Sequence, residues 1–262
     1  MSRYSAMFER LDREGAFGAF LMLGDPDLET SARRLDELVE AGADMIEVGI
    51  PFSDPVADGP VIQAAAQRAL AAGVKVSDCL ELLATFRAKH PSIPVGILTY
   101  ANIVRARAGF VRDAAEAGAD SLLIADVPSI EAEPFAREMV QAGIEPVLIA
   151  AVNTPDPALK RVASLAKAYT YCVSRVGITG THANGQFDSG LIRRLHGAAA
   201  PPAVFGFGIS KPEHVRAALG AGARGVICGS AIVECAALGG DVTELVRSLK
   251  AATRERLGAA MN

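Results

Sequence analysis

The sequence predicts an α/β fold, a single (β/α)8 barrel of the TIM type with extra helices at the N-terminus and after the late strands. Segments with helical periodicity alternate regularly with short apolar runs, and no Gly/Ser-rich linker divides residues 1–262 into separate domains. A length of 262 residues is also close to the usual size of one such barrel. The main alternative is a doubly wound open sheet. However, the segment 23–27 after the first strand lacks the Gly-rich dinucleotide fingerprint typical of that fold.

A short motif, Ala-Gly-Ala-Asp or a variant of it, recurs between helix-like segments and the strands that follow them. It occurs at 41–44, 117–120, 142–145 and 221–224. Its glycine stands where a helix C-cap needs a positive φ, which glycine adopts without a Cβ clash. The motif therefore marks the helix-to-strand turns of a repeating β-α unit.

The expected strands are continuous apolar runs, as in a parallel sheet that is buried on both faces. They are 16–24, 45–50, 94–100, 121–126, 146–150, 168–174, 203–208 and 225–230. Amphipathic or helix-like segments lie between them, at 28–41, 61–70, 134–141, 156–167, 212–219 and 231–237.

The composition narrows the class of protein further. Hydrophobic residues make up 50% of the chain and the mean hydropathy is +0.26, which excludes a disordered chain. The net charge is −4 and the pI is near 5.6, so nucleic acid and anionic membranes are not expected as main partners. No run approaches the roughly 18 apolar residues of a membrane span, and the N-terminal segment lacks the core of a signal peptide. We therefore expect a cytoplasmic enzyme.

The four cysteines, Cys79, Cys172, Cys228 and Cys235, form no CxxC pair and have no histidine at metal-ligand spacing. We expect no metal site and interpret the cysteines as free thiols, mostly buried, in a reducing compartment.

Two carboxylates are the leading candidates for chemistry, because barrel active sites lie at the C-terminal ends of the strands. Glu47 stands inside an expected strand, on the opposite face from Ile46 and Val48. It is either a partly desolvated general acid or base or the partner of a structural Arg or Lys, and both interpretations stay open. Asp54 and Asp58 follow in a Pro- and Gly-rich loop, where each could cap a turn or a helix start. In favour of chemistry, Glu47 and Asp58 would share one barrel mouth, as proton-transfer sites require.

Glycines cluster after the last three expected strands, in the segments 177–180, 206–208 and 229–230. Small residues let backbone N–H groups approach an anion, and Ser230 opens a short helix whose N-terminus carries partial positive charge. This is the usual place of the barrel phosphate site. No lysine lies within these motifs, so backbone amides would supply most of the binding; simple turns are the alternative.

The segment 47–63, Glu-Val-Gly-Ile-Pro-Phe-Ser-Asp-Pro-Val-Ala-Asp-Gly-Pro-Val-Ile-Gln, closely resembles the signature of tryptophan synthase α subunits. The similarity extends along nearly the whole chain, with matching motifs at 23–26, 98–102, 125–128, 169–175, 177–180, 206–210 and 229–233. The chain departs from the usual family pattern at Met22, at 150–155 and at 181–188, which touch the pocket wall and a loop but neither Glu47 nor Asp58.

The resemblance implies a retro-aldol cleavage of indole-3-glycerol phosphate to indole and glyceraldehyde 3-phosphate. It implies that Glu47 is the general acid and base and that Asp58 stabilises the cationic indolenine at the ring N–H. The implied substrate contacts are Phe20, Ile62, Leu98 and Phe207 around the indole, Tyr171 near the reacting side chain, and Gly180, Gly208, Gly229 and Ser230 at the phosphate.

The resemblance also implies a partner, a pyridoxal-phosphate β subunit in an α2β2 heterotetramer, and no cofactor in this chain. The loop 51–60 and the loop around Thr179 would form a lid in which Asp58 and Thr179 are hydrogen-bonded, with Asp54 at the partner interface. Three alternatives remain: a standalone indole-releasing lyase, a related phosphate-binding barrel isomerase or synthase, and a binding subunit without chemistry. The intact Glu47 and Asp58 pair argues against the last of these.

Overall fold

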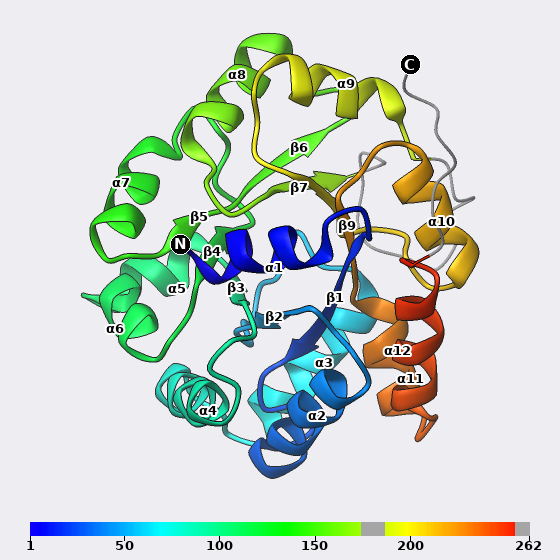
Figure 1. The fold of residues 1–262 in the computed structure, drawn as a ribbon. Helices are drawn as coiled ribbons and strands as arrows, with labels where there is room; N and C mark the ends of the chain where they lie inside the picture. Colours follow the sequence, from blue (N-terminus) through cyan, green and yellow to red (C-terminus); the bar gives the residue numbers. More distant parts are fainter. Residues whose placement is uncertain (174–186, 255–262) are drawn as a thin grey trace.

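The computed structural model describes residues 1–173 and 187–254, and its strands form one parallel sheet that is rolled into a nearly closed barrel (Figure 1). Neighbouring strands follow the order β5-β4-β3-β2-β1-β9-β8-β7-β6. The strands are β1 (Ala16–Met22), β2 (Met45–Gly49), β3 (Val95–Thr99), β4 (Ser121–Ile124), β5 (Glu145–Pro146), β6 (Leu148–Ala151), β7 (Thr170–Val173), β8 (Ala203–Phe205) and β9 (Gly225–Cys228).

The two ends of this strand order meet in the chain, because only Val147 separates β5 from β6. β5 pairs with β4 and β6 pairs with β7, so the two segments together act as one barrel strand. The N–H of Val147 donates to the carbonyl oxygen of Leu122 at 3.1 Å and continues the pairing across the break. The eight barrel strands expected from the sequence are confirmed, although most of them end one to three residues earlier than expected.

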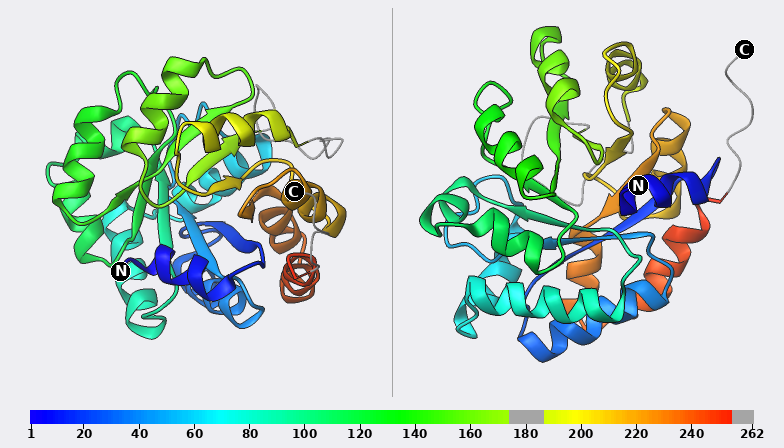
Figure 2. Two further views of the ribbon diagram at one scale, coloured as in Figure 1. Left: turned by 45° about the horizontal axis from the view of Figure 1, so that its top comes forward. Right: turned by 60° about the vertical axis from the view of Figure 1, so that its left-hand side comes forward.

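Helices surround the barrel on its outside (Figure 2). They are α1 (Arg3–Leu11), α2 (Leu28–Glu40), α3 (Pro60–Ala71), α4 (Val76–Lys89), α5 (Ala101–Ala106), α6 (Phe110–Glu116), α7 (Glu133–Gln141), α8 (Asp156–Leu165), α9 (Ser189–Gly197), α10 (Pro212–Gly220), α11 (Ser230–Ala237) and α12 (Val242–Ala251). The six helices expected from the sequence are confirmed to within two residues at each end. In residues 1–173 and 187–254, no helix is long and apolar enough to cross a bilayer.

The repeated Ala-Gly-Ala-Asp motif forms the helix-to-strand turns that the sequence predicts. Its glycines, Gly42, Gly118, Gly143 and Gly222, have φ values of 105°, 93°, 81° and 100°. A side chain at such angles would be strained, so glycine is the residue that ends each of these helices cleanly.

The aspartates that close two copies of this motif hold the amino-terminal ends of neighbouring strands together. Asp44 precedes β2, and its Oδ2 accepts from the Phe17 N–H of β1 at 2.9 Å. Asp120 precedes β4, and its Oδ2 accepts from the Val95 N–H of β3 at 2.8 Å. Both carboxylates are also paired with cations, as Asp44 is with Lys250 at 2.6 Å. The amino end of the barrel is thus fixed by buried, compensated charge.

Helix α1 covers this same end of the barrel (Figure 1, blue). Its Tyr4 is fully buried and shares a hydrogen bond of 2.9 Å with Ser121, the first residue of β4. Arg3 of the same helix pairs with Asp120 at 2.7 Å. Because α1 closes the amino end, the opposite end, where the strands finish, is left for a ligand.

Candidate active site

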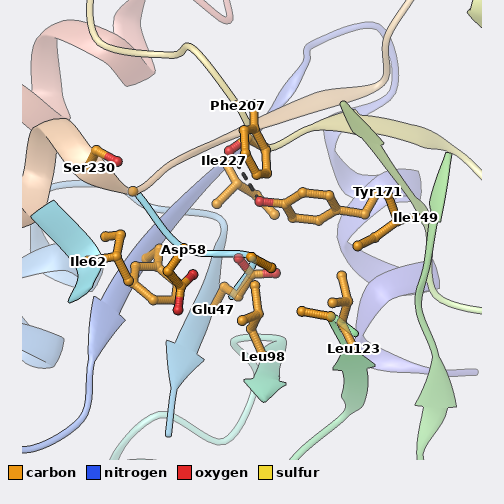
Figure 3. Close-up of a pocket in the computed structure, with 15 residues that line it drawn as sticks. Glu47, Asp58, Ile62, Leu98, Leu123, Ile149, Tyr171, Phe207, Ile227 and Ser230 are labelled. Carbon is orange, nitrogen blue, oxygen red and sulfur yellow. Dashed lines mark hydrogen bonds between the residues drawn. The ribbon is translucent and has the colours of Figure 1, made fainter. Parts of the chain in front are cut away.

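A cavity of about 530 Å³, including the space at its open mouth, lies at the carboxyl ends of the strands (Figure 3). Most of its wall is apolar, and Glu47 and Asp58 are the two acidic side chains among the described residues that line it. The lining residues are Phe20, Glu47, Ala57, Asp58, Ile62, Leu98, Leu123, Ala125, Ile149, Tyr171, Gly206, Phe207, Ile227, Gly229 and Ser230.

Glu47 is the central residue of β2, and strand alternation directs its side chain into the barrel while Ile46 and Val48 face the surrounding helices. The side chain is only 3% exposed. Its Oε1 accepts a hydrogen bond of 3.1 Å from the hydroxyl of Tyr169. Within residues 1–173 and 187–254, no Lys or Arg forms an ion pair with Glu47, so the structural ion pair that the sequence left open does not occur there.

Burial raises the pKa of Glu47 to about 8, and the nearby charge of Asp58 adds to this rise while the Tyr169 hydrogen bond opposes it. A carboxyl group removed from water without a cation is more stable in its neutral form. Glu47 is therefore protonated at neutral pH and can donate a proton into the cavity.

Asp58 lies in the loop between β2 and α3, with 8% of its surface exposed. The hydroxyl of Tyr100 donates to its Oδ2 at 2.9 Å and accepts from the Ala57 N–H at 3.2 Å. The N-cap of α3 is Gly59, without a side-chain capping bond, so Asp58 does not cap this helix. Burial raises the pKa of Asp58 to about 6, against the lowering effect of Tyr100. Asp58 is thus mainly ionised at pH 7, when Glu47 is neutral.

The five side chains expected around an aromatic substrate, Phe20, Ile62, Leu98, Tyr171 and Phe207, all line this cavity. Tyr171 donates from its hydroxyl to the carbonyl oxygen of Gly206 at 3.1 Å, and its ring meets Phe207 edge-on with centroids 6.1 Å apart. A Cβ atom on Gly206 would lie 2.0 Å from the Tyr171 ring. Glycine is therefore required at 206 for Tyr171 to occupy this place.

Gly229 and Ser230 are also among the residues that line the cavity. Ser230 is the first residue of α11, and its N-cap Gly229 offers no side chain to the free N–H groups of the first turn. No Lys or Arg is among the described lining residues, so an anion here would be held by amides and the helix terminus.

The remaining expected residues lie elsewhere. Gly208 has a φ of 76° and follows Phe207 just outside the cavity wall. Asp54 is exposed in the loop before α3. Gly180 and Thr179 lie outside the described residues, as does any contact between Thr179 and Asp58.

Tyr100 and Tyr169, whose hydroxyl groups donate to the two carboxyl groups, are functional residues that were not predicted from the sequence. Both tyrosines stand in motifs that matched the family, but nothing in their own segments shows which carboxylate each one meets. Also missed were the lining residues Ala57, Leu123, Ala125, Ile149 and Ile227. For those within strands, the two-residue alternation of inward-facing side chains was the available signal.

Fold and site together define the class of this protein as a (β/α)8-barrel enzyme, with its site where such enzymes carry theirs. Comparison with known proteins gives the family. The family model for the tryptophan synthase alpha chain matches residues 8–260. The tryptophan synthase alpha chain of Serratia proteamaculans is 49% identical over 239 residues, which is 89% of each chain.

Solved structures agree with this assignment. Tryptophan synthase subunit alpha from Legionella pneumophila superposes with a TM-score of 0.86 at 29% identity, over 97% of this chain and 98% of that one. A tryptophan synthase complex from Pyrococcus furiosus contains a chain with a TM-score of 0.78 at 36% identity, over 94% and 99%. The present chain belongs to the tryptophan synthase alpha chain family, and is a lyase.

Proposed function

We propose that this chain cleaves indole-3-glycerol phosphate to indole and glyceraldehyde 3-phosphate, with Glu47 as general acid and base and Asp58 as the stabiliser of the ring cation. The observation that carries the proposal is the pair of buried carboxyls in one aromatic-lined cavity, with pKa values near 8 and 6 and no Lys or Arg paired with them in residues 1–173 and 187–254. Two carboxyls whose environments separate their pKa values mark an acid and a base.

Glu47 can carry both proton transfers of the reaction. In its neutral form it donates a proton to C3 of the indole ring, which becomes an indolenine cation. Its carboxylate then removes the proton from the side-chain hydroxyl beside the bond to be broken. The O–H electron pair forms the aldehyde C=O, and the electron pair of the broken C–C bond returns to the ring. Indole and glyceraldehyde 3-phosphate are released, and Glu47 is protonated again.

Asp58 acts by charge. As a carboxylate it accepts a hydrogen bond from the indole N–H and stabilises the positive charge that appears when C3 is protonated. Such an interaction is stronger in a cavity with apolar walls than in water. In this proposal Phe20, Ile62, Leu98 and Phe207 hold the ring, and Tyr171 lies beside the glycerol chain.

We place the phosphate at Gly229 and Ser230, where the uncapped first turn of α11 presents N–H groups. Gly208 and Gly180 are the further proposed phosphate-binding residues. This arrangement separates the two polar ends of the substrate, with the ring nitrogen at the carboxylates and the phosphate at the helix.

The proposed partner is a β subunit that carries pyridoxal phosphate, in an α2β2 heterotetramer, while this chain holds no cofactor. Family membership and the Pyrococcus furiosus complex support this assembly. The loop 51–60 bears an exposed Asp54 and a Val56 that is 72% exposed, which suits a docking face beside the cavity. The loop would close as a lid with Thr179. We take residues 1–262 to act as one domain in the cytoplasm.

An indole-release assay on indole-3-glycerol phosphate, with and without purified β subunit, tests the proposal. We expect indole and glyceraldehyde 3-phosphate in equal amounts and a faster reaction when the β subunit is present. Absence of indole under both conditions would overturn the lyase assignment to this site. Equal rates with and without the β subunit would instead support a standalone lyase.

A further inference from the structure

Tyr4 lies on α1 at the amino end of the barrel, yet only one side chain separates it from Glu47. Its ring packs against the ring of Tyr169, with centroids 5.4 Å apart and planes inclined by 58°. The hydroxyl of Tyr169 in turn donates to Oε1 of Glu47 at 3.1 Å. Both tyrosines are 1% exposed. A continuous path of buried contacts therefore runs through the barrel from the N-terminal helix to the proposed acid.

The barrel makes room for this path at Gly96. Gly96 is the β3 residue that lies beside Glu47 in the strand register. A Cβ atom there would lie 2.5 Å from Oγ of Ser121 and 3.0 Å from the hydroxyl of Tyr4. The space that a side chain would fill is thus occupied by the hydrogen-bonded pair of Tyr4 and Ser121, which are 2.9 Å apart. That bond fixes the outer end of the Tyr4 ring.

We propose that Tyr4 is a positioning residue for the reaction, because its ring holds Tyr169 where the Tyr169 hydroxyl can bind Oε1 of Glu47. This inference rests on the proposed function of Glu47. The Tyr169 bond uses one carboxyl oxygen and leaves Oε2 for the proton that enters the cavity. Without the Tyr4 ring, Tyr169 would gain space to tilt, and Glu47 would lose its fixed orientation.

Among the residues that the structure describes, the polar and titratable groups facing this path lie at its two ends. Asp58, Tyr169 and Tyr171 face Glu47, and burial together with the Asp58 charge raises the pKa of Glu47 while the Tyr169 bond lowers it. Ser121, Asp120 and Glu145 face Tyr4 at the amino end. Weakening the Tyr169 bond should therefore move the pKa of Glu47 further upward.

Two substitutions of Tyr4 distinguish the contribution of its ring from that of its hydroxyl group. Tyr4→Phe keeps the ring contact, so we expect kcat within about twofold of the unsubstituted chain. Tyr4→Leu removes the ring, and we expect kcat about tenfold lower, as for the loss of one ordinary hydrogen bond, with KM little changed. The pKa of Glu47, followed by carboxyl 13C NMR and assigned by its absence in Glu47→Gln, should rise in Tyr4→Leu and stay in place in Tyr4→Phe.

A control on the same helix tests whether α1 acts only through stability. Leu11 is also buried, two turns further along α1. Leu11→Ala should lower the free energy of unfolding but leave the pKa of Glu47 and the kcat of the folded protein unchanged. In addition, Tyr4→Leu combined with Tyr169→Phe should lower kcat no more than Tyr169→Phe does alone.

The proposal is overturned if Tyr4→Leu leaves both the pKa of Glu47 and kcat unchanged, or if Leu11→Ala changes them as much. Failure of the proposed function looks different: the unsubstituted chain would release no indole, or Glu47→Gln would stay active. The NMR measurement reports the Tyr4 effect in either case, because it does not depend on turnover.

Discussion

The two ends of the barrel bury carboxylates to the same degree but surround them differently. At the amino end, Asp44 and Asp120 are 4% and 9% exposed; at the carboxyl end, Glu47 and Asp58 are 3% and 8% exposed. Asp44 is bonded to Lys250 at 2.6 Å, and Asp120 is bonded to Arg87 at the same distance. Each of the carboxylates at the other end meets only a tyrosine hydroxyl among the interactions of the described residues.

This difference shows that burial by itself does not give a carboxyl group a chemical role. A cation within hydrogen-bond distance stabilises the charged form, whereas a hydroxyl donor offsets only part of the cost of leaving water. At the amino end, the ion pairs of Asp44 and Asp120 tie strands and helices together. At the carboxyl end Glu47 keeps a proton, which a reaction can use.

The largest expected effect is that of Glu47→Gln on turnover. The amide keeps the size and a hydrogen-bonding oxygen but cannot exchange a proton, so kcat should fall by about 10²–10⁴ while substrate binding is largely kept. Rates of indole release measure this, with Glu145→Gln at the amino end as the matched control. If kcat fell equally in both variants, or if Glu47→Gln stayed nearly as active as the unsubstituted chain, the two ends of the barrel would not differ in chemical role.

Breaking an ion pair at the amino end should lower the stability of the protein without changing its turnover. Lys250→Met leaves the buried Asp44 without its closest cation, and we expect a loss of about 3–5 kcal/mol in the free energy of unfolding, with kcat of the folded protein unchanged. Urea unfolding measures the loss. The exposed pair of Arg137 and Glu133 is the control, because Arg137→Ala should cost less than about 1 kcal/mol. A fall in kcat without a loss of stability would contradict the comparison.

The pH dependence of stability sharpens the contrast further. The pKa of Glu47 is raised from 4.5 to about 8 on folding, so the folded state binds more protons between these values. Its contribution therefore lowers the free energy of unfolding as pH rises from about 4.5 to 8, by at most about 1.4 kcal/mol per pH unit. Glu47→Gln should gain stability relative to the unsubstituted chain through this window in urea titrations. A constant difference would show that Glu47 is ionised throughout.

The smallest expected effect is the change in reaction rate with pH near neutrality. The active form has Asp58 ionised and Glu47 protonated, so kcat/KM should be highest near pH 7 and fall below about 6 and above about 8. Below the lower limit Asp58 loses the charge that stabilises the ring cation; above the upper one Glu47 has no proton to give. Asp58→Asn should be slower and lack the acid limb. A flat profile from pH 5 to 9 would exclude this assignment.

Local sequence patterns determined much of the fold. Continuous apolar runs identified the barrel strands, because a parallel sheet covered on both faces has no polar side. The glycines at 42, 118, 143 and 222 marked helix ends, because the positive φ they adopt is a property of one residue and its neighbours. Glu47 could be recognised for the same reason. An acidic residue inside an apolar strand is unusual, and its immediate sequence neighbours are enough to show this.

The short strand break at Val147 and the helices α4, α5, α6, α9 and α12 were not placed by the sequence analysis. Their boundaries depend on packing against neighbouring barrel elements, and the break at Val147 arises where one strand passes from pairing with β4 to pairing with β7. The hydrophobic periodicity of a segment does not predict which strands it pairs with.

The sequence by itself determined the barrel, the position of Glu47 in a strand and the glycines of the late strand ends. Only the tertiary structure decided that Tyr169 and Tyr100 are the partners of the two carboxylates, 122 and 42 residues away from them, and that Lys250 lies at the other end with Asp44. The protonation of a buried group depends on which neighbours replace its water, and chain closure, not local sequence, brings those neighbours together.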